Sequence, residues 1–203
     1  MDKKYIRSSA KPYMRLFKKK TITEIIMCVI LILFLNISGK CTSYADQSEG
    51  IQSSEYKIKA VYLYNFLKFT DFNRDESQDS SDIIRITILG NDPFGDSFAP
   101  LEGKAIKGKS LQVTRIDDIN AVKKCDLLYI CNSENSKLKH IIGELGNTGI
   151  LTVGETTEFT ELGGIISFFM EDEIVQFSIN IPAAENAGIE FSTQLLQLGR
   201  IIK

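Results

Sequence analysis

The first 45 residues of this 203-residue chain have the three-part composition of a secretory signal peptide, and they limit which residues can belong to the folded domain. A basic start is followed by an uncharged apolar run from Ile25 to Ile37. Ser43-Tyr44-Ala45 then places small residues at the two positions that signal peptidase reads. Because the apolar run is shorter than the ~20 residues of a membrane-spanning helix, we favour cleavage near Ala45 over an uncleaved anchor. Removing 45 of the 203 residues leaves 158, enough for one domain.

The charge of the remaining chain disfavours several classes of partner. The leader carries nine of the 24 Lys and Arg residues but only two of the 26 Asp and Glu residues. The remainder therefore carries 15 basic and 24 acidic residues, a net charge of −9. Because nucleic-acid binding depends on Lys and Arg that neutralise phosphates, we expect no nucleic-acid partner. The same negative charge disfavours adsorption to an anionic bilayer, and we expect no membrane insertion after processing. ATP and nicotinamide cofactors are scarce outside the cytoplasm, so we expect no cofactor.

Alternating apolar segments predict an α/β fold. A polar segment, 46–54, is expected to be disordered, and a helix is expected to follow at 55–69. Strands are predicted at 83–89, 111–116, 126–130 and 150–153, with helices between them at 93–101, 117–124 and 136–145. Segments 163–169 and 175–180 predict a hairpin, and Ser192 is expected to cap a last helix that carries Leu195, Leu198 and Ile202. The predicted architecture, over 55–203, is a single three-layer α/β domain with a mostly parallel sheet, an antiparallel C-terminal hairpin and helices on both faces.

The first predicted helix carries two apolar stripes. One stripe consists of Ala60, Leu63, Tyr64 and Leu67, and the other of Ile58, Tyr62, Phe66 and Phe69. Because a surface helix needs only one apolar face, two stripes predict burial on both sides, either between layers of the fold or against another chain. In the second case the candidate partner-binding residues are Tyr62, Phe66 and Phe69.

Two cysteines remain after removal of the leader, Cys125 and Cys131, in a compartment that permits a disulfide. The residues between them predict a strand, and six residues of strand span ~20 Å. Bridged Cα atoms lie within ~7 Å of each other. A disulfide therefore requires one cysteine to lie off the strand on a chain that turns back, and two separate buried thiols are the alternative.

Three patterns that suggest chemistry have simpler interpretations. Residues 103–110 match G-x-x-x-x-G-K-S, but a phosphate-binding loop precedes a helix and here a strand is predicted to follow. Asn91 and Asp92 follow the first predicted strand, where doubly wound sheets bind ligands, so they are ligand-crevice candidates, with turn formation as the alternative. His140 is the only histidine and has no clustered ligands around it, so we expect no metal site. No G-x-S-x-G segment presents a nucleophile, and no catalytic residues are assigned.

Ordered segments along 55–202 carry a resemblance to a known family. The first is Tyr56-x-Ile58-Lys59-Ala60-x-Tyr62-Leu63-Tyr64-Asn65-Phe66-x-Lys68-Phe69. The others lie at 88–95, 101–109, 125–130, 159–168 and 177–198. In this order and spacing the segments resemble the YfiR family (HmsC-like, DUF4154). The chain lacks the Trp-Pro that the family carries after the position of Phe72 and has a long polar loop there, 74–82.

The resemblance implies a periplasmic regulator and not an enzyme. Such a protein binds the periplasmic sensor region of an inner-membrane diguanylate cyclase and represses the cyclase, which lowers cyclic di-GMP and biofilm formation. The resemblance also implies a homodimer. The alternative function is that of a periplasmic small-molecule-binding sensor that uses the crevice near Asn91 and Asp92.

Overall fold

The computed structural model describes residues 44–74, 81–122, 124–146 and 148–203, with side chains from Ser54 onward. The predicted signal peptide, 1–45, lies outside these residues except for its last two. The chain divides into two units, Met1–Gln47 and Ser48–Lys203, and the domain described below is the second. Among the described residues, every helix is too short or too polar to span a bilayer.

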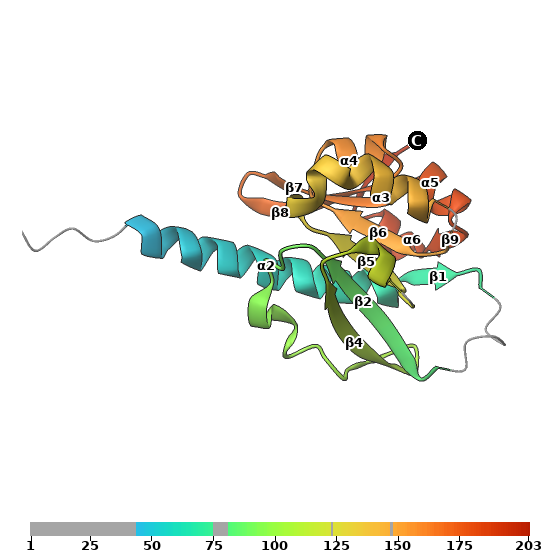
Figure 1. Cartoon of the computed structure of the whole chain (residues 1–203), viewed down its shortest axis with the longest axis horizontal. Helices are drawn as coiled ribbons and strands as arrows, with labels where there is room; N and C mark the ends of the chain where they lie inside the picture. Colours follow the sequence, from blue (N-terminus) through green and yellow to red (C-terminus); the bar gives the residue numbers. More distant parts are fainter. Residues whose placement is uncertain (1–43, 75–80, 123, 147) are drawn as a thin grey trace, which may run out of the picture. The chain divides into compact units, whose positions relative to one another are not determined.

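An eight-stranded sheet forms the centre of the domain, with the strand order β10-β8-β7-β6-β5-β2-β4-β3 (Figure 1). Its strands are β2 Ile83–Leu89, β3 Ala105–Ile106, β4 Lys109–Ile116, β5 Leu127–Ile130, β6 Leu151–Gly154, β7 Ile166–Glu171, β8 Ile174–Asn180 and β10 Arg200–Ile202. The pairs β2–β4, β2–β5, β5–β6, β6–β7 and β8–β10 are parallel, whereas β7–β8 and β3–β4 are antiparallel. The predicted α/β fold with a mostly parallel sheet is confirmed.

The five parallel strands β4-β2-β5-β6-β7 have the order 2-1-3-4-5 when they are numbered among themselves, which is a common doubly wound order. In such sheets the direction of winding reverses between the first and third strands, here β2 and β5. Ligand crevices form beside the carboxyl ends of the strands at that point. The topology therefore directs attention to the residues that follow β2 and β5.

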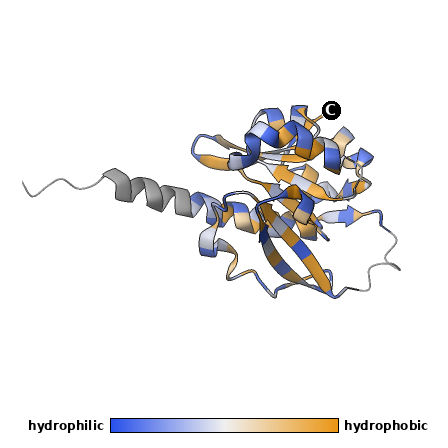
Figure 2. Ribbon diagram, in the orientation of Figure 1, coloured by the Kyte–Doolittle hydropathy of each residue, from blue (hydrophilic) through white to orange (hydrophobic). Residues whose placement is uncertain are grey.

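The strands of the sheet are largely hydrophobic (Figure 2). Their apolar side chains alternate between two buried clusters, as the alternating directions of strand residues require. Leu127 and Tyr129 of β5 join a cluster with helix α2, Tyr44–Lys68, and we call this cluster the α2-side core. Leu128 and Ile130 join a cluster with helix α3, Leu138–Leu145, which we call the α3-side core. The remaining helical elements are η2 Gly95–Phe98, η3 Ile119–Ala121, η4 Asn132–Lys137, α4 Glu158–Glu161, α5 Ile181–Asn186 and α6 Thr193–Leu196.

Helix α2 begins earlier than the sequence predicts. The backbone is helical from Tyr44 to Lys68, so helix occupies the segment 46–54 that was expected to be disordered. Starting a helix is costly but lengthening one is not, and a helix fixed by its packed residues can extend toward its N-terminus at little cost. Our prediction treated the polar composition of 46–54 as a boundary and neglected this extension.

Two predicted helices are reduced to single turns. In place of the helix at 93–101 there is only η2, which follows Asp92 and begins at Gly95, whose φ is +49°. In place of the helix at 117–124 there is only η3, which begins after the extended Asp118 and ends where the chain is extended again at Val122. The Asp118 side chain caps the N–H of Asn120 at the start of this turn, and the β-branched residues favour a longer helix only weakly.

The predicted last helix is also shorter, although its cap is confirmed. Ser192 Oγ accepts a hydrogen bond from the backbone N–H of Leu195, and helix α6 then ends at Leu196. Leu198 is two-thirds exposed, and Ile202 belongs to strand β10, which pairs in parallel with β8. A Cβ at Gly199 would lie 2.7 Å from the Phe177 ring, so glycine allows the chain to approach the sheet closely.

Two turns and a small second sheet complete the domain. The turn between β7 and β8 places Asp172 and Glu173 at positive φ. Residues 103–110 form the β3–β4 hairpin, with Lys107 and Gly108 at positive φ, in place of a strand-to-helix phosphate loop. Strands β1, Thr70–Phe72, and β9, Ile189–Phe191, pair antiparallel and hold the end of α2 against the C-terminal part of the chain. Our sequence analysis did not predict this pair, because three residues are too few for a periodic pattern.

The close packing of Phe159 against glycine predicts a large difference between two Gly→Ala variants. A Cβ at Gly164 would overlap the buried Phe159 ring, so Gly164→Ala should lower the free energy of unfolding by about 1–3 kcal/mol. Gly143 lies in α3 with no atom near its added Cβ, so Gly143→Ala should raise that free energy by up to about 1 kcal/mol. Urea unfolding of both variants measures this, and equal stabilities would contradict the packing argument.

Candidate functional site

Asp92, a predicted crevice residue, holds together the turn after β2. Its Oδ1 accepts a hydrogen bond from the backbone N–H of Phe94 at 2.7 Å, and its Oδ2 accepts one from Nε of Arg115 at 2.5 Å. Arg115 also donates to the carbonyl of Gly95 at 3.1 Å. Both carboxylate oxygens therefore take part in fixing the turn.

Asn91, the other crevice candidate, is exposed and lies between the carboxyl ends of β2 and β5. Its backbone N–H donates to Ser133 Oγ, which follows β5, at 3.0 Å. A Cβ at the neighbouring Gly90, whose φ is +95°, would overlap Ser133. The two strand ends are thus in tight contact at this point. The two cavities discussed below are lined neither by Asn91 nor by Asp92.

A buried ionic network lies at the same edge of the sheet and connects α2 to the carboxyl ends of β5 and β6. The Nζ of Lys59 lies 2.5 Å from a carboxylate oxygen of Glu55 and 3.1 Å from Oε1 of Glu155, and Lys59 is only 3% exposed. Asn132, after β5, donates to Oε2 of Glu155 at 3.3 Å. A buried lysine is stable only when it is paired in this way, so the network fixes the position of α2 on the sheet.

Tyr56 extends the network into the α2-side core. Its hydroxyl donates to Oε2 of Glu155 at 3.2 Å, and Lys59 Nζ lies 4.6 Å from the centre of its ring. Burial, and then the Glu155 carboxylate, raises the pKa of Tyr56 well above its usual range, so Tyr56 remains a hydrogen-bond donor. The ring packs edge-on against Phe94, which also contacts the fully buried Tyr129. Aromatic rings therefore fill the space beneath the turn after β2.

The sequence contained only part of the signal for this network. Glu55 and Lys59 have the i, i+4 spacing of a helical ion pair. This spacing alone does not show that Lys59 faces inward. Glu155 lies 96 positions beyond Lys59 in the numbering, so only the parallel topology brings it to the same edge. Sequence reasoning missed both Lys59 and Glu155 as site residues.

The three candidate partner-binding residues of α2 differ in exposure. Phe66 is fully buried and stacks against Phe168 at a ring separation of 5.6 Å, so it is unavailable to a partner and the prediction for this residue is wrong. Tyr62 and Phe69 are half-buried. Tyr62 packs against the rings of Phe168 and Phe177, which explains why the second apolar stripe is mainly internal.

The exposed apolar surface of α2 consists of the N-terminal part of that stripe and the neighbouring Val61. Ile58 is 46% exposed and Val61 is 49% exposed, and with the half-buried Tyr62 they lie at i, i+3 and i+4. These spacings place the three side chains on one helix face. We call these three residues the α2 patch.

Cys125 and Cys131 are separate buried thiols, so the possible disulfide between them is not present in the structure. Cys125 belongs to the α3-side core and Cys131 to the α2-side core. Residues six apart in one straight strand would point to the same face, so the different clusters show that Cys125, which precedes β5, departs from the alternation of that strand. Burial raises the pKa of Cys125 to about 11 and that of Cys131 to about 12.

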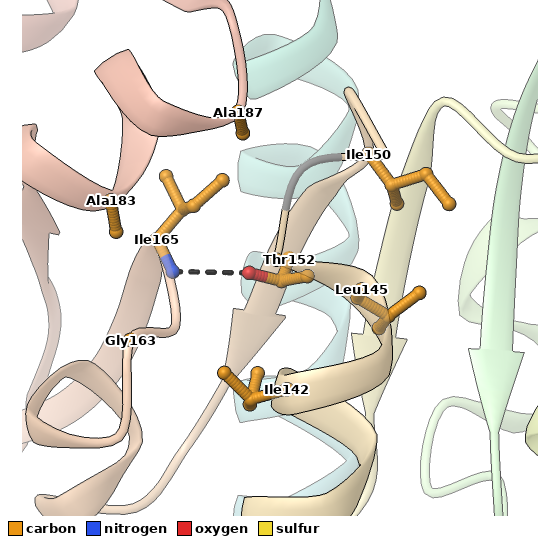
Figure 3. Close-up of a pocket in the computed structure, with 9 residues that line it drawn as sticks. Ile142, Leu145, Ile150, Thr152, Gly163, Ile165, Ala183 and Ala187 are labelled. Atoms are coloured by element: carbon orange, nitrogen blue, oxygen red, sulfur yellow. Dashed lines mark hydrogen bonds between the residues drawn. The ribbon is translucent and has the colours of Figure 1, made fainter.

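A small cavity lies between α3, α5 and the strand β6 (Figure 3). Ile142, Leu145 and Ile165 are among the residues that line it, and the backbone N–H of Ile165 donates to Thr152 Oγ1 at 3.1 Å. Its volume of about 10 Å³ is close to the minimum for one water molecule. It is too small for a metabolite.

His140 lies on the exposed side of α3. Within the described part of the chain, no group of three His, Cys, Asp or Glu side chains is arranged to hold a metal ion.

The polar cluster around Glu155 contains no paired nucleophile and base, and the chemistry that it supports is hydrogen bonding and ion pairing.

A family model with the description DUF4154, YfiR/HmsC-like, matches residues 56–200. The comparison with curated proteins finds no match. Among solved structures, a conserved domain protein from Vibrio cholerae O1 biovar eltor is 18% identical, with 59% of this chain and 54% of that chain covered and a TM-score of 0.42. The ABC domain from Streptococcus pneumonia, in complex with L-Trp, is 13% identical, with 59% and 55% covered and a TM-score of 0.44. The chain spans about half the length of these two proteins.

The buried ionic network predicts a strong effect of removing one partner. Lys59→Met leaves the Glu155 carboxylate buried without its cation, so the free energy of unfolding should fall by about 3–5 kcal/mol. Adding Glu155→Gln should recover part of the loss, because no buried charge then remains. Arg200→Met removes the exposed pair with Glu171 and should cost less than about 1 kcal/mol. Urea unfolding tests this, and similar losses for Lys59→Met and Arg200→Met would contradict it.

The raised thiol pKa values predict slow alkylation and a loss of stability in alkali. Unfolded thiols titrate near pH 8.5, whereas the folded ones keep their protons to about pH 11–12. Their contribution to stability is therefore complete below about pH 8.5 and is lost as the pH rises toward the folded values. Iodoacetamide at pH 8 should label both thiols only after unfolding, as measured by mass spectrometry. Rapid labelling of the native protein would contradict this.

Proposed function

The chain belongs to the YfiR/HmsC-like family, and on this premise we propose that it is a periplasmic protein that binds and represses a membrane-bound diguanylate cyclase. Repression lowers cyclic di-GMP and with it biofilm formation. The observation that carries the proposal is the family match over residues 56–200, which spans the whole domain from α2 to β10. Export through the predicted signal peptide, with cleavage near Ala45, belongs to the same proposal.

The α2 patch supports a protein-binding role. Ile58 and Val61 expose apolar surface at the centre of a helix that the Lys59 network holds rigidly on the sheet. A rigid, preorganised apolar face loses little conformational entropy when a partner covers it. We propose that Ile58, Val61 and Tyr62 contact the periplasmic sensor region of the cyclase. The candidate Phe69, half-buried at the end of the helix, adds to the edge of this surface.

Repression by such a complex works by a shift of population. The bound protein stabilises the inactive state of the cyclase only to the extent that it binds that state more tightly than the active one. The expected homodimer is part of the proposal, and sedimentation of the purified protein at several concentrations tests it. A small-molecule function at Asn91 and Asp92 is less favoured, because the carboxylate of Asp92 is already engaged in its turn.

Charged substitutions in the α2 patch test the proposed contact. Ile58→Asp and Val61→Asp, introduced together, should weaken capture of the cyclase by in-cell crosslinking about tenfold or more, because a buried charge opposes the interface. Cellular cyclic di-GMP should then rise to the level of a deletion strain. The matched control is Ile174→Asp, at a somewhat more exposed apolar side chain on β8 that points away from the α2-side core.

The control should capture the cyclase as the wild type does. The result that would overturn the proposed contact is a double variant that folds, is exported and still represses normally. A deletion that raises cyclic di-GMP equally in a strain without any cyclase carrying a periplasmic domain would overturn the proposed function itself.

A further inference from the structure

An open groove of about 330 Å³ lies on the face of the sheet that is opposite α2. Thr87 of β2 belongs to this face, since its neighbours Ile86 and Ile88 point into the α2-side core. The groove is lined by Arg85, Thr87, Thr114, Ile116, Ala121, Val122 and Lys124. Its volume is at the lower end of the range of about 300–1,000 Å³ that is typical of ligand pockets.

The groove exists because the connection from β4 to β5 is too short to cover the sheet. In a doubly wound sheet the crossover between parallel strands is usually an α-helix packed on one face. Here the crossover contains only η3, and Thr114 of β4 remains exposed where a helix would otherwise lie. Arg85 and Ile116 are half-buried at the edges of the uncovered area.

The charge of the groove is opposite to that of the whole domain. Of the described residues that line it, Arg85 and Lys124 are cationic and none carries a carboxylate. Lys124 also takes part in another interaction, so Arg85 is the cation on which recognition depends. The nearby Asp126 carboxylate is already compensated, because it accepts hydrogen bonds from Arg74 at 2.9 Å and from the backbone N–H of Arg85 at 2.7 Å. The Arg85 guanidinium makes a long contact of 3.5 Å with Ser81 Oγ. The chain after the predicted leader has a net charge of −9, so a cationic groove has the opposite sign of charge to the domain as a whole.

The remaining lining residues provide both apolar surface and hydroxyl groups. Ile116, Ala121 and Val122 form one apolar wall, and the hydroxyls of Thr87 and Thr114 lie on the sheet side. A few polar groups beside an apolar wall are typical of a site that binds a small amphipathic molecule. A guanidinium pairs with a planar carboxylate through two parallel hydrogen bonds, a geometry that gives both strength and orientation.

We propose that this groove binds a small organic acid. The carboxylate of the ligand pairs with Arg85, and the apolar body of the ligand covers Ile116, Ala121 and Val122. The site is separate from the α2 patch, because the sheet lies between them. It therefore does not depend on the proposed function, and binding of the acid is measurable without any cyclase.

The test uses phenylacetate as the probe and the protein as it is exported and purified from cells. Methyl resonances of Thr87, Thr114 and Val122 should shift and saturate as phenylacetate is added. Phenylacetamide has the same shape but no charge, and it should produce no saturable shift. The affinity for phenylacetate should fall as salt is added, because the pairing at this exposed groove is screened.

Two variants separate the roles of charge and space. Arg85→Gln should weaken phenylacetate binding about tenfold to a hundredfold, because it removes a charged hydrogen-bonding partner. Ala121→Trp should abolish binding by filling the groove from an exposed position, and it carries the test if Arg85→Gln fails to fold. Arg200→Gln, at an exposed arginine on β10, is the matched control and should bind as the wild type does.

The proposal is overturned by any of three results. One is a phenylacetate titration that does not saturate or that shifts resonances outside the groove only. The second is a folded Arg85→Gln variant with unchanged affinity, and the third is equal binding of phenylacetamide. Loss of phenylacetate binding with normal cyclase repression would leave the proposed function intact, so the two proposals fail separately.

Discussion

The buried pairing of Lys59 with Glu55 and Glu155 is the interaction on which the arrangement of this domain depends most. It connects the first helix of the domain to the carboxyl end of β6, and Asn132 and Tyr56 join it from β5 and α2. Apolar packing alone would allow α2 to slide along the sheet, since hydrophobic contact is not directional. A paired buried cation defines one position of the helix, because any other position leaves a charge without its partner.

The central strands were predictable from the sequence because each is a short apolar run between turn residues, whereas the strands of two or three residues, β1, β3, β9 and β10, were missed. Strand β2 has the predicted bounds, and β4, β5 and β6 differ from prediction by one or two residues at their ends. The helices were less predictable where local geometry shortened them. The Asp118 cap and the close approach of Gly199 to Phe177 depend on geometry that spacing alone does not contain. Extension of α2 to Tyr44 was missed for the opposite reason, because helix continued through polar residues.

The candidate site was only partly predictable. The topology rule directed attention to the carboxyl end of β2, where the candidates Asn91 and Asp92 mainly build the turn. The groups with unusual environments, Lys59, Glu155 and Tyr56, lie instead beside the carboxyl ends of β5 and β6. The two-stripe pattern of α2 correctly indicated extra burial. The pattern could not separate internal from external contacts, and Phe66 proved to be internal while Ile58 and Val61 are the exposed apolar residues.

The eight-stranded sheet ends in very short strands on both sides, β3 with two residues and β10 with three. A sheet edge offers unpaired backbone groups to any other extended chain, and longer edges bind more strongly. These outer strands pair with only two residues of β4 and three residues of β8, so the rest of each longer strand has no strand partner on its outer side within the described part of the chain. Another extended chain would therefore add to this sheet beside β4 or β8, and not along β3 or β10.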